Sequence, residues 1–135
     1  MKLSNDVRET VQRRAQGACE YCRLPQEASI LPHQVDHIIG RQHRGSDDVA
    51  NLCLCCIHCN LKKGPNIASI DPETGILVAL YHPRCHSWRE HFTVAIEGTI
   101  QGLTAEGRAT VQLLDMNGED RVRLRALLLR RSRHP

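Results

Sequence analysis

Two pairs of cysteines with a two-residue spacing constrain this chain more than any other feature of its sequence. Cys19 and Cys22 form the first pair, Cys56 and Cys59 form the second, and 33 residues lie between the pairs. A Cys-x-x-Cys turn lets two thiolates reach one ion, and two such turns complete a tetrahedron of soft ligands with no open position. The pattern therefore predicts a structural zinc site that ties two distant segments together.

The choice of the second pair depends on the segment just before it. Cys53 and Cys56 have the same two-residue spacing, so the second pair could also lie in that register. The alternation before Cys56 is typical of a strand on which Cys53 and Cys55 share one face as small apolar residues. This interpretation leaves Cys56 and Cys59 as the second pair of zinc ligands, and we expect Cys85 to be a buried thiol.

The composition of the 135-residue chain shows why a metal would help it to fold. Hydrophobic residues make up 41% of the sequence, but aromatic residues make up only 3%, so the usual large core side chains are scarce. The net charge of +3 is too weak by itself to indicate a nucleic-acid partner. No apolar run approaches the roughly 20 residues of a membrane span, and no signal-peptide core is visible. We expect a cytoplasmic protein without a membrane partner, where seven cysteines indicate metal binding rather than disulfides.

The predicted elements indicate an α+β fold with a boundary near residue 65. Residues 1–65 are expected to form the zinc-stabilised core, and residues 66–135 to form a mixed α/β extension packed on it. The extension is predicted to contain a strand, a hairpin over residues 92–103 and two helices, the first capped by Thr104. The elements predicted for the core are a helix at about 5–16 that Ser4 can cap, strands at 35–39 and 51–55, and a helix at 56–63.

A set of polar residues between and within the cysteine pairs resembles a known enzyme motif. Asp36 and His37 lie together in the first expected strand, Asn51 follows His37 by 14 residues, and Asn60 follows Asn51 by nine. With the cysteines, this pattern resembles the HNH endonuclease family, which has the ββα-metal fold. The resemblance covers about residues 17–65.

The resemblance implies a role for each of these four residues. His37 would be the general base that takes a proton from the attacking water, and Asn51 would tie the strand to the following loop and orient that base. Asp36 and Asn60 would be ligands of one catalytic divalent ion. The family commonly has histidine where Asn60 stands, and asparagine is a known alternative. A carboxylate and an amide oxygen suit Mg²⁺ or Mn²⁺.

Basic residues flank the expected site. Arg41, His43 and Arg44 lie in the loop after the first strand, and Lys62 and Lys63 end the expected helix. Such side chains can bind phosphates, and these contacts position a nucleic acid without reading its sequence. Solvated loop charges are an equally good interpretation of each of them.

The sequence as a whole predicts a metal-dependent endonuclease that nicks or cleaves DNA. It would hold structural Zn²⁺ and catalytic Mg²⁺ or Mn²⁺, and the resemblance implies 5′-phosphate and 3′-hydroxyl ends. The alternatives are a non-catalytic zinc-stabilised module that binds nucleic acid and a zinc-stabilised protein-interaction domain. The presence of Asp36, His37 and Asn60 together favours the enzyme, and the sequence identifies no protein partner.

Overall fold

A computed structural model describes residues 3–133 of the chain, which fall into two compact units. The first unit runs up to Ile67 and also includes His82–Cys85, and the second contains Ala68–Tyr81 and the residues from His86 onward. The described residues form five α-helices and three two-stranded sheets, which confirms the predicted α+β class. None of these helices combines the length and the apolar composition that crossing a membrane requires.

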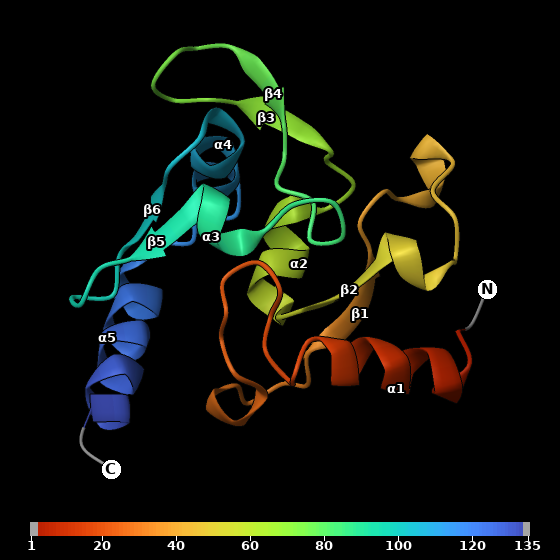
Figure 1. The fold of residues 1–135 in the computed structure, drawn as a ribbon, viewed down its shortest axis with the longest axis horizontal. Coiled ribbons are helices and arrows are strands. Elements are labelled where there is room, and N and C mark those ends of the chain that lie inside the picture. Colours follow the sequence, from red (N-terminus) through yellow and green to blue (C-terminus); the bar gives the residue numbers. More distant parts are fainter. Residues whose placement is uncertain (1–2, 134–135) are drawn as a thin grey trace. The chain divides into compact units, whose positions relative to one another are not determined.

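The first unit is a helix, a hairpin and a second helix, with long loops after the first helix and between the two strands (Figure 1). Strands β1 and β2 pair antiparallel, with His37 opposite Leu52, and α2 follows β2 after a single residue. This strand–strand–helix order is the one expected of a ββα-metal core. The elements of the unit are α1 (Asn5–Arg14), β1 (Gln34–His37), β2 (Leu52–Cys55) and α2 (Ile57–Lys63).

Helix α1 begins where the sequence predicts and ends earlier. Its cap is Ser4, whose Oγ accepts a hydrogen bond from the Val7 N–H at 3.2 Å. The prediction that the helix extends to residue 16 was wrong, because Gln16 and Gly17 adopt φ values of 55° and 73°. Two successive left-handed residues cannot continue an α-helix, so the chain turns there into the first cysteine pair.

The β1–β2 hairpin has two faces with different chemistry. On one face, Val35, Leu52 and Leu54 pack against Val11 of α1 and form the small apolar core of the unit. On the other face, Asp36 lies opposite Cys53, and α2 covers this side through the hydrogen bond from Lys63 Nζ to the Ile38 carbonyl oxygen. Because side chains alternate along a strand, Asp36 and His37 point to opposite faces.

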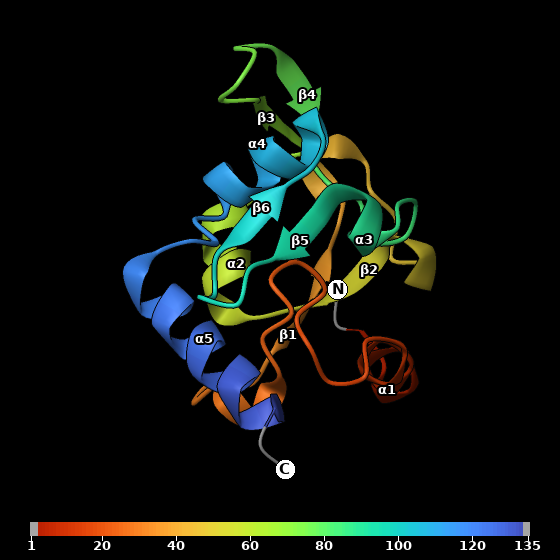
Figure 2. The same ribbon diagram turned by 60° about the vertical axis from the view of Figure 1, so that its left-hand side comes forward.

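The second unit contains the extension (Figure 2). Strands β5 and β6 form the predicted hairpin, and the Thr104 hydroxyl accepts a hydrogen bond from the Gly107 N–H to cap α4 as expected. The sequence did not reveal the partner of the strand after Gly75, which is the short strand β3. The elements of this unit are β3 (Ala68–Ile70), β4 (Leu77–Ala79), α3 (Trp88–His91), β5 (Phe92–Val94), β6 (Ile100–Gly102), α4 (Ala105–Leu113) and α5 (Glu119–Arg133).

Aromatic packing and one buried ion pair stabilise the second unit. The Phe92 ring lies 5.0 Å from the rings of both Tyr81 and Trp88, so three of the four aromatic residues of the chain pack together here. The Arg108 guanidinium donates two 2.9 Å hydrogen bonds to the carboxylate of Asp71, whose side chain is fully buried. These hydrogen bonds hold the pKa of the Asp71 carboxyl well below its usual range.

Candidate metal centre and active site

The four cysteines of the two pairs meet at one point in the first unit. The sulfur atoms of Cys19, Cys22, Cys56 and Cys59 all lie within 4.8 Å of one another, and all four residues are buried. A zinc–sulfur bond of about 2.3 Å places tetrahedral ligands about 3.8 Å apart. The Sγ atoms of Cys22 and Cys56 are 3.7 Å apart, which is far too long for a disulfide. This four-cysteine site is built to hold a structural metal ion such as zinc.

The backbone of each cysteine pair prepares the site. In the first pair, the Cys19 N–H bonds to the Leu24 carbonyl oxygen and the Arg23 N–H bonds back to the Cys19 carbonyl oxygen, each at 2.9 Å. In the second pair, Cys56 caps α2, and its sulfur accepts the Cys59 N–H at 3.4 Å. A sulfur at a helix N-terminus is held in the electrostatic environment that favours a thiolate.

Burial makes the site dependent on a cation. It raises the pKa of the Cys19 thiol to about 12, whereas hydrogen bonds from the surrounding thiols lower the pKa of Cys56. Four buried thiolates without a counter-charge would repel one another, so the sulfurs other than that of Cys56 favour the protonated form until a divalent cation binds. Binding of the metal and folding of this unit are therefore coupled.

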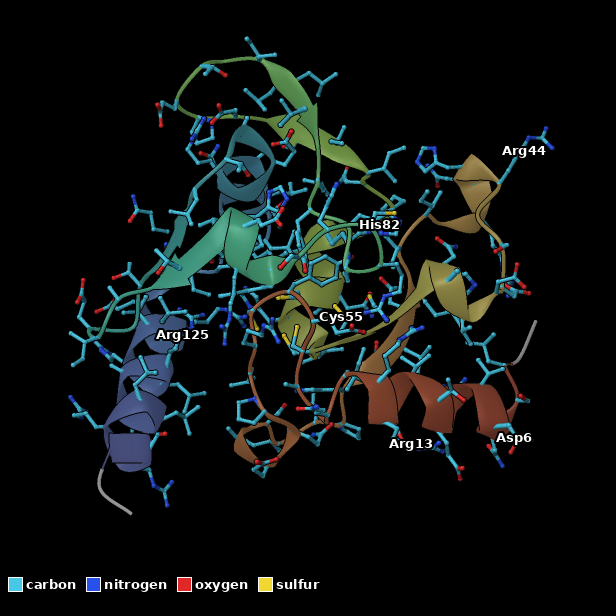
Figure 3. All side chains as sticks on the ribbon, viewed as in Figure 1. Asp6, Arg13, Arg44, Cys55, His82 and Arg125 are labelled. Atoms are coloured by element: carbon cyan, nitrogen blue, oxygen red, sulfur yellow. The ribbon has the colours of Figure 1, made fainter. Side chains whose placement is uncertain are left out.

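The structure resolves the register of the second pair in favour of Cys56 and Cys59. Cys53 and Cys55 lie on β2 and are buried, and they share one face of the strand as expected. Cys55 is seen inside the unit in Figure 3. The expectation that Cys85 is a buried thiol was wrong, because its N–H bonds to the His82 carbonyl oxygen in a tight turn that exposes the side chain.

Asp36 has a buried carboxylate oxygen that lacks a hydrogen-bond partner. Its Oδ2 is buried and has no hydrogen-bond partner among the described protein atoms. Burial raises the pKa of its carboxyl, and the positive charge of Lys63 opposes this rise. A buried carboxylate oxygen without a partner costs free energy, and a bound cation is one way to compensate that cost. The position fits a metal ligand.

Lys63 is buried rather than available to phosphate. Only 2% of the residue is exposed, and its Nζ donates a 2.9 Å hydrogen bond to the Ile38 carbonyl oxygen. The prediction that Lys63 binds nucleic acid was therefore wrong. The physical reason is that the last turn of α2 packs on the hairpin, so the ammonium points toward Asp36 and the end of β1.

Asn60 lies on the same side of the hairpin as Asp36. Its Nδ2 donates a hydrogen bond to Oε1 of Gln34, and Gln34 shares a face of β1 with Asp36 because the two are separated by one residue. Asn60 and Lys63 are three residues apart on α2 and therefore face the hairpin together. With Nδ2 engaged, Oδ1 is the amide atom left to bind a cation.

His37 is hydrogen-bonded to an acidic residue, Asp47, that the sequence pattern does not single out. Its Nε2 lies 2.7 Å from Oδ1 of Asp47, and Arg41 Nη2 approaches the same oxygen at 3.4 Å. The hydrogen bond with His37 lowers the pKa of the Asp47 carboxyl. The sequence offers Asp47 and Asp48 as neighbouring loop acids, and nothing in their pattern distinguishes them.

Asn51 connects the end of the first strand to the loop that follows. Its Oδ1 accepts the Ile39 N–H at 2.9 Å, and its Nδ2 donates to the carbonyl oxygens of Ile39 and Ser46 at 2.9 and 2.8 Å. Gly45 lies against the same segment, where an added Cβ would stand 1.7 Å from the Ile39 carbonyl oxygen. The loop that carries Asp47 is therefore fixed at both ends.

Four of the five predicted phosphate-binding residues are exposed. Arg41, His43 and Arg44 lie on the loop after β1, and Lys62 lies near the end of α2. Arg44 projects outward from this loop in Figure 3. Their exposure leaves them accessible to a polyanion.

The span that contains both cysteine pairs and the four polar motif residues matches a known family. Residues 19–66 match the family model described as HNH endonuclease. This span of the first unit is therefore similar to an HNH domain. Comparisons with curated proteins and with solved structures gave no match. An HNH domain with a four-cysteine metal site indicates a nuclease or a nucleic-acid-binding role.

Proposed function

We propose that the HNH domain is a metal-dependent endonuclease that hydrolyses phosphodiester bonds of DNA by nicking or cleaving it. The observation that carries this proposal is the buried, unpartnered Oδ2 of Asp36, next to a histidine that is held by an acid. A domain that only bound nucleic acid would gain nothing from a buried carboxylate with an unsatisfied oxygen, because such a group destabilises the fold.

Asp36 and Asn60 would hold the catalytic ion. Each offers one hard oxygen, and this incomplete set suits Mg²⁺ or Mn²⁺, which keep water and substrate phosphate as further ligands. When bound, such an ion would stabilise the negative charge that develops on the phosphate and on the leaving oxygen. The chain's own contribution is to position these two oxygens through β1 and α2.

His37 would act as the general base. Its Nε2 is engaged by Asp47, and its Nδ1 has no hydrogen-bond partner among the residues that the structure describes. The neutral imidazole is a suitable acceptor for a proton from water near neutral pH. The side chain is 18% exposed, so a water molecule can reach it.

The exposed cations would supply affinity for DNA. Arg41, His43 and Arg44 on the loop and Lys62 on α2 can contact phosphates, which gives binding that depends on salt and does not depend on sequence. This is consistent with a net charge of +3, because the cations that matter are local rather than spread over the chain.

Cleavage of supercoiled plasmid tests the proposal. Zinc-loaded protein should convert the plasmid to nicked or linear forms with Mg²⁺ or Mn²⁺, and a chelator that leaves the zinc in place should stop the reaction. His37→Ala should reduce the rate by at least about 10²-fold, whereas His86→Ala, an exposed histidine of the second unit, should not. If wild type binds DNA but does not cut it with any divalent metal, the domain is a non-catalytic nucleic-acid-binding module instead.

A further inference from the structure

The contact between His37 and Asp47 determines which nitrogen of the imidazole carries the proton. A carboxylate can only accept hydrogen bonds, so at 2.7 Å the Nε2 of His37 must be the donor. Bonds of this kind between an imidazole and a carboxylate are among the stronger hydrogen bonds in proteins. The two side chains are 18% and 30% exposed, so solvent screens the contact only in part.

Hydrogen bonds hold the backbone of the loop that carries Asp47. The residue directly before it, Ser46, is held by its carbonyl oxygen to Nδ2 of Asn51 at 2.8 Å. Arg41 lies 3.4 Å from the same carboxylate oxygen that His37 contacts, and both partners favour the charged form of Asp47. The next residue, Asp48, is exposed, and no hydrogen bond or ion pair of its carboxylate is found within residues 3–133.

We infer that Asp47 is a positioning residue, which holds the His37 ring through Nε2–H and so leaves the Nδ1 lone pair to accept the proton of the attacking water. This inference rests on the proposed nuclease function. In the step, an O–H bond of water breaks and its proton moves to Nδ1, while the water oxygen forms a bond to phosphorus. The bond from phosphorus to the leaving oxygen breaks, and solvent protonates that oxygen.

Asp47 itself would not accept a proton in this step. Its charge would stabilise the imidazolium that forms, and its geometry would keep the ring from rotating. An acid that orients a catalytic histidine in this way in serine proteases is worth about 10⁴-fold in kcat when its replacement leaves the wrong tautomer. The exposed loop around Asp47 favours a smaller effect here, about 10²-fold.

The first test is spectroscopic and needs neither DNA nor a catalytic metal. Zinc-loaded protein with ¹⁵N-labelled histidine, at about pH 9 where an ordinary imidazole is neutral, should show a slowly exchanging, hydrogen-bonded proton on Nε2 of His37. Asp47→Asn should lose this resonance or move it strongly, and Asp48→Asn should leave it unchanged. The Asp48 variant removes the same charge from the same loop, so it distinguishes an effect of the carboxylate's position from an effect of net charge.

The second test is kinetic and uses the same three proteins. Asp47→Asn should lower kcat for plasmid nicking by about 10²-fold and change KM by less than about threefold, because positioning of a base acts on the transition state. Asp48→Asn should retain wild-type kcat. Circular dichroism and zinc content should match in all three proteins.

The outcomes separate this inference from the proposed function. A His37 proton on Nδ1 in wild type, an unchanged Nε2–H resonance in Asp47→Asn, or an effect on KM alone would overturn the positioning role. An equal loss of kcat in Asp48→Asn would overturn it as well, because a charge effect would then suffice. If wild type cuts no DNA, the nuclease proposal fails, and the spectra still decide whether Asp47 holds the imidazole.

Discussion

Replacing one zinc ligand should unfold the first unit, and its structure allows the size of the effect to be worked out. The unit comprises about 70 residues and contains one aromatic residue, Tyr21. Its apolar cluster is built on Val11, Leu52 and Leu54. A core of this size rarely supplies more than about 3–5 kcal/mol of stability. Structural zinc contributes about 10–16 kcal/mol in comparable small domains.

Cys59→Ser removes one of the four sulfurs that bind the metal and, with it, part of the free energy that metal binding contributes to folding. A quarter of the metal-coupled free energy is about 2.5–4 kcal/mol, and a buried hydroxyl without a partner costs about 1–3 kcal/mol more. The total loss of about 3.5–7 kcal/mol is as large as the whole contribution of about 3–5 kcal/mol from the apolar core. We therefore expect a variant with little bound zinc and no cooperative unfolding of the first unit.

The assay is thermal unfolding followed by circular dichroism, together with zinc content by elemental analysis. Wild type should contain about one zinc per chain. The matched control is Cys85→Ser, which changes an exposed thiol outside the cluster and should unfold like wild type. A Cys59→Ser protein that keeps a full equivalent of zinc and the wild-type unfolding temperature would refute this reasoning.

Three further predictions concern the site, the second unit and the loop. Asp36→Ala and Asn60→Ala should each lose metal-dependent nicking by at least about 10²-fold, yet bind DNA within about tenfold of wild type in gel shifts at fixed salt, because no cation is removed. The pKa of Asp71 is lowered by Arg108, so the pair's stabilisation is present above the unfolded carboxyl pKa of about 3.9 and is lost as the pH falls through the folded value. Asp71→Asn should therefore lower the unfolding temperature at neutral pH, and the difference in unfolding temperature from wild type should become smaller in strong acid. An equal difference in unfolding temperature at neutral pH and in strong acid would contradict this prediction. Gly45→Ala should cost about 1–3 kcal/mol in denaturant unfolding, since its Cβ would overlap a backbone oxygen, and an unchanged midpoint would argue against the tight loop.

Local chemistry in the sequence was sufficient to predict several parts of this protein. Ser4 and Thr104 cap helices because a hydroxyl before a helix satisfies its first N–H groups. Cys19 and Cys59 belong to one metal site because each Cys-x-x-Cys pair supplies two of the four tetrahedral ligands, and the fold brings the two pairs together. Such signals depend on neighbours within a few positions, so a sequence carries them directly.

Tertiary structure alone decided the roles of the charged residues. Lys62 and Lys63 are adjacent lysines in the sequence, yet packing of α2 on the hairpin exposes the first and buries the second against a carbonyl oxygen. Asp47 and Asp48 are adjacent acids, yet only the first reaches His37. Which side chain faces inward depends on how two segments pack, and adjacent residues of a helix or loop point in different directions. The sequence indicated which types of residue form the site, and the fold decided which of two adjacent lysines or aspartates takes part in it.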